Sequence, residues 1–294
     1  MRILVTGAQG MLGQDLLPTL KQAGHQPIAA DLRPGIGEDD LVLDITDLAA
    51  VRRAVDQEKP DAIVHGAAYT NVDGAEADEV GAYRVNALGT WNLALAAQAA
   101  DIPLLYVSTD YVFDGTLGRA YDEYDATNPQ SVYGRSKRAG EIHVERLCRK
   151  HYIVRTAWLY GHGGKNFVET ILKAGAERPE LKVVNDQWGC PTTTVDLAGA
   201  IAQLIGSGRY GTYHATGQGA CTWFDFAVEI LRQGGLSTPV HPQTTEGLNR
   251  PAPRPAYSVL RNRALELGGF PAMPDWKEAL RGYMASRKVP ASQP

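Results

Sequence analysis

In the first 160 residues, short apolar runs alternate with longer segments in which apolar residues recur at helical spacing. Nearly continuous apolar runs predict buried β-strands at residues 2–6, 26–31, 61–68, 103–109 and 151–156. The segments between them predict helices at residues 9–24, at 47–60, at 83–100 and after Ser131. This alternation is typical of a parallel sheet covered on both faces. With right-handed crossovers, the predicted fold class is α/β, a doubly wound, Rossmann-like parallel sheet.

After about residue 161 the alternation becomes less regular, which indicates a second, smaller domain. Residues 166–177 and 194–205 predict helices, and residues 181–184 and 211–216 predict short strands. The proline-rich residues 249–260 predict a loop. We expect a first domain at residues 1–160, with parts of 190–220 interleaved, and a second that is mainly residues 161–294.

The end of the chain predicts one more helix. Its apolar pattern covers residues 274–284, and Asp275 stands where an N-cap is expected. The last residues, 288–294, predict a frayed tail.

Charge and cysteine content narrow the classes of function. The 294 residues carry a formal net charge of −4, which argues against binding to nucleic acid or to an anionic membrane surface. The three cysteines, Cys148, Cys190 and Cys221, have no CxxC spacing, which favours free thiols in a reducing compartment. No apolar run approaches the length of a membrane helix, and no signal peptide precedes the first strand. These features predict a cytoplasmic protein.

A glycine-rich turn follows the first strand. The stretch "TGAQGMLG" places Gly7, Gly10 and Gly13 at intervals of three residues before the first helix. Glycines at such a turn let the backbone approach a pyrophosphate, and the helix N-terminus favours its negative charge. Their position after an N-terminal strand predicts a dinucleotide site, with a ligand-free turn as the alternative.

Asp31 ends the second strand, where a carboxylate can accept hydrogen bonds from the hydroxyls of an adenosine ribose. Its charge would repel a 2′-phosphate, which favours NADH. Arg33 lies two residues on and favours NADPH instead, so both cofactors stay open. The alternative for Asp31 is an ordinary strand-end residue.

Tyr133 and Lys137 are four residues apart in the stretch "NPQSVYGRSKRAGE". On a helix they share a face, and an ammonium beside a phenol lowers the pKa of that phenol. Tyr133 can then give a proton to a carbonyl oxygen that is being reduced. The hydroxyls of Ser108 and Thr109 end the fourth predicted strand, at the sheet edge where ligands bind. The alternatives are a surface Tyr–Lys pair and a polar strand cap.

In these residues the sequence resembles the extended short-chain dehydrogenase/reductases. The matching stretches span about residues 1–260 and are "TGAQGMLG", "AAYTNVDGAE", "VNALGTWNL", "VSTDYVFDG", "YGRSKRAGE", "RTAWLYG", "GCPTTTVDLA" and "RPAYSVL". The resemblance implies a dinucleotide-binding first domain and a substrate-binding second domain. It also implies NADPH or NADH as the cofactor.

The resemblance also implies roles for individual residues. Catalytic positions are Thr109, Tyr133 and Lys137. Cofactor-binding positions are Gly7, Gly10, Met11, Leu12, Gly13, Asp31, Asp44, Ile45, Ala67, Ala68, Tyr69, Tyr133 and Lys137. Substrate contacts are Thr109, Asp110 and Trp158, and we expect Arg254 to join them. Core packing is the alternative for Trp158, and a solvated loop charge is the alternative for Arg254. Asn86 lies in a stretch that helps to order the active-site helix in this superfamily.

Within the superfamily the sequence is most similar to the dTDP-4-dehydrorhamnose reductases. This likeness implies reduction of the C4 ketone of dTDP-4-dehydro-L-rhamnose to dTDP-L-rhamnose, with a dTDP-sugar as substrate. Related dehydratases carry an acid directly after the Thr-Asp pair, where this chain has Tyr111, which favours simple reduction. Two alternatives remain: a reductase that forms the C4 epimer, dTDP-6-deoxy-L-talose, and a non-catalytic regulatory subunit that binds a dinucleotide.

Some relatives dimerise through a metal held by carboxylates. No compact ligand cluster is evident in the sequence, so no metal is expected. A monomer and a homodimer are both compatible with the sequence.

Overall fold

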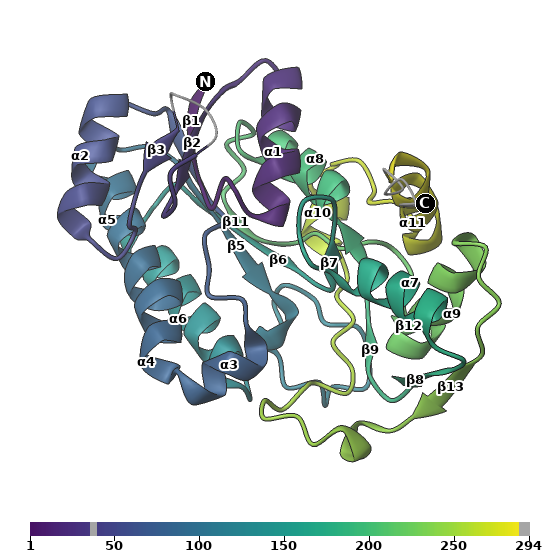
Figure 1. The fold of residues 1–294 in the computed structure, drawn as a ribbon. Helices are drawn as coiled ribbons and strands as arrows, with labels where there is room; N and C mark the ends of the chain where they lie inside the picture. Colours follow the sequence, from purple (N-terminus) through teal and green to yellow (C-terminus); the bar gives the residue numbers. More distant parts are fainter. Residues whose placement is uncertain (36–39, 288–294) are drawn as a thin grey trace.

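A seven-stranded parallel sheet forms the centre of the molecule (Figure 1), seen in a computed structural model that describes residues 1–35 and 40–287. Its strands lie in the order β11-β6-β5-β4-β1-β2-β3, and all neighbours run parallel. They are β1 (Arg2–Thr6), β2 (Gln26–Asp31), β3 (Leu41–Val42), β4 (Ala62–His65), β5 (Leu104–Thr109), β6 (His151–Thr156) and β11 (Gly211–His214). The strand order reverses between β1 and β4, which opens a crevice for ligands at their carboxyl ends.

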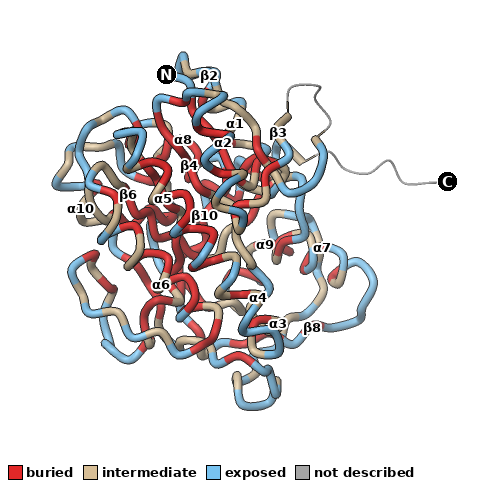
Figure 2. Tube along the Cα trace, turned by 90° about the vertical axis from the view of Figure 1, so that its left-hand side faces the viewer, coloured by how far each residue is buried: buried red, intermediate tan, exposed pale blue. Residues whose placement is uncertain are grey.

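Helices cover both faces of this sheet, as the predicted doubly wound class requires. One face carries α1 (Met11–Gln22), α8 (Thr194–Leu204) and α10 (Arg263–Leu267), and the other carries α2 (Leu48–Glu58), α5 (Thr90–Ala99) and α6 (Val132–Leu147). Alternate residues of β1 point to opposite faces of the sheet, each of which has its own apolar core. Ile3 and Val5 pack with α1, whereas Leu4 packs towards α5. Figure 2 shows the buried residues concentrated in the centre, along the strands and the inner sides of the helices.

Side-chain caps begin several of the helices. The Asp47 carboxylate accepts from the amide of Ala49 at 2.8 Å before α2, and Ser131 Oγ accepts from the amide of Gly134 at 3.0 Å before α6. These bonds satisfy amides that a helix leaves free in its first turn. The predicted cap of the last helix, α11 (Trp276–Ser286), is confirmed, because Asp275 accepts from the amide of Lys277 at 2.8 Å.

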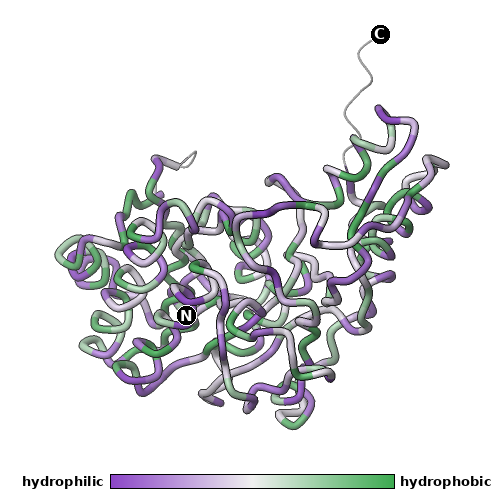
Figure 3. Tube along the Cα trace, turned by 90° about the horizontal axis from the view of Figure 1, so that it is seen from below, coloured by the Kyte–Doolittle hydropathy of each residue, from purple (hydrophilic) through white to green (hydrophobic). Residues whose placement is uncertain are grey.

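The remaining elements form a second body with its own apolar core. It contains α7 (Phe167–Glu177), α9 (Trp223–Gln233) and α11, with β8 (Leu181–Val184) paired in parallel to β13 (Val240–Gln243). Figure 3 shows this body as a smaller lobe beside the sheet domain. Short pairs lie between the two bodies: β7 (Leu159–Tyr160) with β10 (Thr192–Thr193), and β9 (Trp188–Gly189) with β12 (Cys221–Thr222). The division at residue 160 stays a prediction, while α8 and β11, from residues 190–220, pack in the sheet domain.

Some elements differ from the sequence-based expectations. The predicted helix at residues 83–100 is divided into the end of α4 (Glu79–Tyr83), a π-helical turn (Arg84–Gly89) and α5. The short helix α3 (Val72–Ala77), the helix α9 and the strand β13 were not predicted. The side chain of Asn86, in the π-helical turn, bonds to both backbone groups of Tyr69 and to Ser136 Oγ, contacts that no sequence periodicity reveals.

The predicted loop at residues 249–260 is confirmed, and the predicted frayed tail lies outside the described residues. Within the described part of the chain, no helix combines the length and apolar character that crossing a bilayer requires.

Candidate active site

The glycine-rich turn between β1 and α1 is packed too closely for side chains. Gly7 has a φ of +74°, and a Cβ there would lie 2.6 Å from the amide nitrogen of Ala67. A Cβ on Gly13 would lie 2.3 Å from the carbonyl oxygen of Ala8. No side chain caps α1 at Gly10, and its first turn holds no acidic residue. The amides and the positive end of the helix dipole are therefore free for an anionic group.

Asp31 lies beside this turn at the carboxyl end of β2. Its Oδ2 accepts from the amide of Gln9 at 3.0 Å, which holds the carboxylate against the glycine-rich loop. Arg33 Nε lies 3.9 Å from Asp31 Oδ1, and the Arg33 side chain is 71% exposed. The structure thus brings together Asp31, which favours NADH, and Arg33, which favours NADPH.

The other cofactor positions lie at the ends of neighbouring strands. Ala67, Ala68 and Tyr69 follow β4, and Asn86 fixes the backbone of Tyr69 by accepting from its amide at 2.8 Å and donating to its carbonyl at 3.1 Å. Met11 and Leu12 form the first turn of α1.

Asp44 and Ile45 follow β3. Hydrogen bonds from Thr46 hold the pKa of Asp44 below its usual value, and Ile45 is buried beside Gly89. The family resemblance implies that these two residues bind the cofactor.

Tyr133 lies in the first turn of α6, and its ring packs against a small cluster formed by Ala75, Ala82 and Val132. The Tyr111 ring meets it edge to face, with 5.5 Å between ring centroids. Burial raises the pKa of Tyr133 to about 12, although a hydrogen bond with Thr109 acts in the opposite direction. The phenol is therefore protonated at neutral pH.

The expectation that Lys137 lowers the pKa of Tyr133 is wrong for this structure. Lys137 Nζ donates to the carbonyl oxygen of Val107 at 2.7 Å and lies over the ring of Tyr106. Burial lowers the pKa of Lys137 to about 7, and the ammonium is not among the groups that shift Tyr133. Helical spacing places the two residues on one face, but desolvation governs both pKa values.

Thr109 and Asp110 lie at the carboxyl end of β5. Thr109 Oγ1 donates to Asp110 Oδ1 at 3.0 Å, and Asp110 Oδ2 accepts from Ser258 Oγ at 2.6 Å. Burial raises the pKa of Asp110 to about 6. The neighbouring Ser108 Oγ is buried without a hydrogen-bond partner among the described residues.

Trp158 adopts a left-handed backbone conformation, with φ of 47°. Its indole stacks on that of Trp223, with 3.6 Å between ring centroids and 8° between planes, and Gly189 lies close to its edge. A left-handed conformation in a bulky residue is unusual and marks a position where the surroundings fix the side chain. The sequence identified Trp158 but not its partner Trp223, which begins the unpredicted helix α9.

Arg254 forms a two-pronged ion pair with Asp73. Nη1 lies 3.0 Å from Oδ1 and Nη2 lies 3.0 Å from Oδ2. The Arg254 side chain is only 17% exposed, so the alternative of a solvated loop charge is wrong. Asp73 was missed as a functional candidate, although it lies within the quoted stretch "AAYTNVDGAE".

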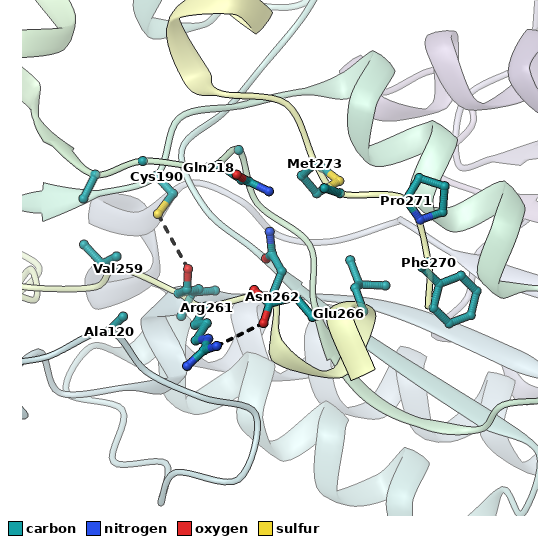
Figure 4. Close-up of a pocket in the computed structure, with 16 residues that line it drawn as sticks. Ala120, Cys190, Gln218, Val259, Arg261, Asn262, Glu266, Phe270, Pro271 and Met273 are labelled. Carbon is teal, nitrogen blue, oxygen red and sulfur yellow. Dashed lines mark hydrogen bonds and ion pairs between the residues drawn. The ribbon is translucent and has the colours of Figure 1, made fainter. Parts of the chain in front are cut away.

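A separate cavity lies away from these residues. Its volume is about 470 Å³, and Figure 4 shows Gln218, Asn262, Met273 and Phe270 around it, beside α10. The predicted site residues are all described by the structure, and none of them lines this cavity. The cavity is thus separate from the Tyr133 site.

Comparison with protein families matches residues 1–289 to the family described as "RmlD substrate binding domain". Over 286 residues the chain is 46% identical to the dTDP-4-dehydrorhamnose reductase of Streptomyces griseus, which covers 95% of this chain and 91% of that protein. A solved dTDP-4-dehydrorhamnose reductase from Clostridium acetobutylicum has 46% identity and a TM-score of 0.92, covering 97% of this chain and 99% of that chain. The Bacillus anthracis enzyme, solved in complex with NADP, has 41% identity and a TM-score of 0.91, with the same coverage.

Proposed function

This chain belongs to the RmlD substrate binding domain family, and from that membership we propose that it reduces the C4 ketone of dTDP-4-dehydro-L-rhamnose to dTDP-L-rhamnose with NADPH or NADH. One observation supports the proposal most directly: the protonated phenol of Tyr133 lies beside Thr109 at the carboxyl edge of the sheet. The glycine-rich turn lies at the same edge. Relatives named dTDP-4-dehydrorhamnose reductase support the choice of substrate.

The residues at the sheet edge fit a dinucleotide. The uncapped N-terminus of α1 and the tight glycines suit a diphosphate, and Asp31 lies where it can accept from ribose hydroxyls. In this proposal Met11, Leu12 and residues 67–69 line the cofactor, with Asp44 and Ile45 on its adenine side. The bound NAD(P)H supplies a hydride to C4 of the sugar.

The proton comes from the protein. Tyr133 holds its proton on the phenol oxygen at neutral pH and donates it to the C4 oxygen of the substrate. Thr109 Oγ1 stabilises the charge that develops on that oxygen, for which its hydroxyl turns away from Asp110. In this proposal the Lys137 ammonium faces the nicotinamide ribose and donates hydrogen bonds to its hydroxyls.

The sugar nucleotide enters from the side of the second body. We place the Trp158 indole, which Trp223 covers on one face, beside the nucleotide part of the substrate, where it provides aromatic contact area. Arg254 contributes positive charge beside the Tyr111 phenol, even though Asp73 holds its guanidinium. We place Asp110 near the sugar ring through its contact with Thr109.

Other reactions fit the site less well. The position that holds an acid in related dehydratases is Tyr111, whose pKa burial raises far above neutrality, so it offers no base for elimination. The relatives named as reductases disfavour the talose-forming and non-catalytic alternatives. The three cysteines are free and buried, which suits the reducing cytoplasm that we propose as the location.

Incubation of the purified protein with dTDP-4-dehydro-L-rhamnose and each cofactor tests the proposal. We expect NAD(P)H absorbance to fall only when the keto sugar is present, and NMR of the product to show the rhamnose configuration at C4. A 6-deoxytalose product, or cofactor binding without turnover, would overturn it.

A further inference from the structure

The short helix α3 (Val72–Ala77) lies between the loop at residues 249–258 and the helix that carries Tyr133. Asn71 caps it by accepting from the amide of Gly74 at 2.9 Å. It belongs to no sheet, and its polar side chains make contacts in two directions. Through these contacts α3 connects the loop to the active site, a role that the family resemblance does not assign to it.

On the side that faces the loop, the Asp73 carboxylate accepts several hydrogen bonds. Besides the two bonds from Arg254, its Oδ2 accepts from Arg250 Nη1 at 3.0 Å and its Oδ1 accepts from the amide of Ala252 at 3.3 Å. The Asp73 side chain is 25% exposed, so these bonds are partly shielded from water. One carboxylate therefore holds three residues of the loop.

Towards the active site, α3 contacts the first turn of α6. Glu76 Oε1 accepts from the amide of Val132 at 2.8 Å, and that amide is one of those a helix leaves free. Ala75 is fully buried in the cluster with Val132 against which the Tyr133 ring packs. The position of α3 therefore determines the position of the phenol.

The same loop reaches the reaction centre by a second route. Ser258, six residues after Ala252, donates to Asp110 Oδ2 at 2.6 Å, and Asp110 accepts from Thr109. The loop is thus tied at one end to Tyr133 through α3 and at the other to Thr109. A shift of the loop displaces both groups that act on the substrate oxygen.

We propose that Asp73 is a positioning residue that couples the loop at residues 249–258 to the placement of Tyr133 through α3. The expected changes in kcat and KM rest on the proposed function. Loss of the Asp73 ion pair frees the loop that carries Arg254 and loosens the first turn of α6. Binding of NAD(P)H, which uses the glycine-rich turn and Asp31, is left intact.

The test compares Asp73→Asn with Glu229→Gln. Glu229 also holds an arginine by two bonds, from Arg232, but both residues lie within α9, so this pair joins no separate elements. For Asp73→Asn we expect kcat to fall and KM for the keto sugar to rise, each about tenfold, because small displacements of catalytic groups are costly. The Kd for NADPH stays within about twofold of the wild-type value, and Glu229→Gln behaves like the wild type.

Hydrogen exchange gives a readout that needs no substrate. In Asp73→Asn the amide of Val132 should exchange faster than in the wild type, with NADPH bound in both proteins. Unchanged exchange there, or unchanged kcat and KM, would overturn the coupling. An equal loss of NADPH affinity would also overturn it, because that indicates general damage. An inactive wild type refutes the proposed function, while the exchange experiment still tests the coupling.

A double-mutant cycle separates positioning from direct substrate contact. If Arg254 acts through Asp73, Arg254→Gln should add little to the effects of Asp73→Asn. Additive effects would show that the two residues act independently and would overturn the coupling. If Asp73→Asn does not fold, Arg254→Gln removes the two-pronged ion pair from the loop side. Exchange of the Val132 amide then decides, because Arg254 is also proposed to act at the substrate.

Discussion

Lys137 Nζ lies 2.7 Å from the carbonyl oxygen of Val107, and the ammonium lies over the ring of Tyr106. A buried lysine with a neutral acceptor lacks the charge compensation that a carboxylate would provide. Burial therefore lowers the pKa of Lys137 to about 7, although the charge of Glu141 opposes the shift. The pKa of Lys137 therefore lies close to neutral pH.

The first prediction concerns pH. In the proposed function the Lys137 ammonium donates hydrogen bonds to the nicotinamide ribose, so activity needs the charged form, which is present below about pH 7 and lost above it. The value of kcat/KM for NADPH, which reports groups of the free enzyme, should be level below this pH and decline as pH rises through it. Lys137→Arg keeps its charge over this range, so its profile should stay level; the same decline there would assign the titration to another group.

The second prediction concerns the proton donor. Tyr133→Phe keeps the ring that packs against Tyr111 and Ala75 but removes the phenol oxygen. We expect turnover to fall by about 10²- to 10⁴-fold, the usual contribution of a general acid. Titration of NADPH fluorescence should show nearly unchanged cofactor binding. Ordinary turnover in this variant would refute the assignment of Tyr133.

The third prediction concerns the choice of cofactor. Asp31→Ala removes the carboxylate that lies beside the glycine-rich turn and should weaken binding of NADH by about tenfold, the scale of a hydrogen bond to a charged group. NADPH should lose less, because its 2′-phosphate is relieved of a nearby negative charge. The matched variant Arg33→Ala should weaken NADPH more than NADH. Equal losses of both cofactors in Asp31→Ala would show that Asp31 does not contact the ribose.

The fourth prediction concerns the stacked indoles. Trp223→Ala leaves Trp158 without the ring that covers one of its faces. We expect KM for the keto sugar to rise by about fivefold, since an aromatic pair contributes about 1 kcal/mol beyond its buried area. Trp223→Phe should keep part of the effect. Near-ultraviolet circular dichroism should lose the signal of the coupled indoles, and an unchanged KM despite that loss would exclude a role in substrate binding.

Local sequence was sufficient for most of the sheet domain. The alternation of apolar strands and helices predicted β1, β2, β4, β5 and β6 in order, and Ser131 and Asp275 stood at the caps they occupy. The glycine-rich turn could be recognised because close packing leaves no room for a side chain at Gly7 and Gly13, so glycine recurs at fixed positions. Apolar periodicity and helix caps depend on neighbours within a few residues, so their spacing can be recognised in the sequence.

Contacts between distant segments were not predictable in this way. The helical spacing of Tyr133 and Lys137 suggested a lowered phenol pKa, but only the fold shows that both groups are desolvated and that Val107 takes the ammonium. The π-helical turn around Asn86 likewise depends on bonds to Tyr69 and Ser136 from other segments. Burial and hydrogen bonding of this kind arise only when separate elements pack together.

The sequence by itself determined the parallel sheet and the glycine-rich turn, and it identified the phenol and the hydroxyl that we propose to act on the substrate. The tertiary structure alone decided that Asp73 holds Arg254, 181 residues away, and that Trp223 backs Trp158. Periodicity states which face of an element is buried, because each side chain direction repeats along the chain. Periodicity does not show which distant charge or ring that face will contact, because those contacts form only when whole elements pack together.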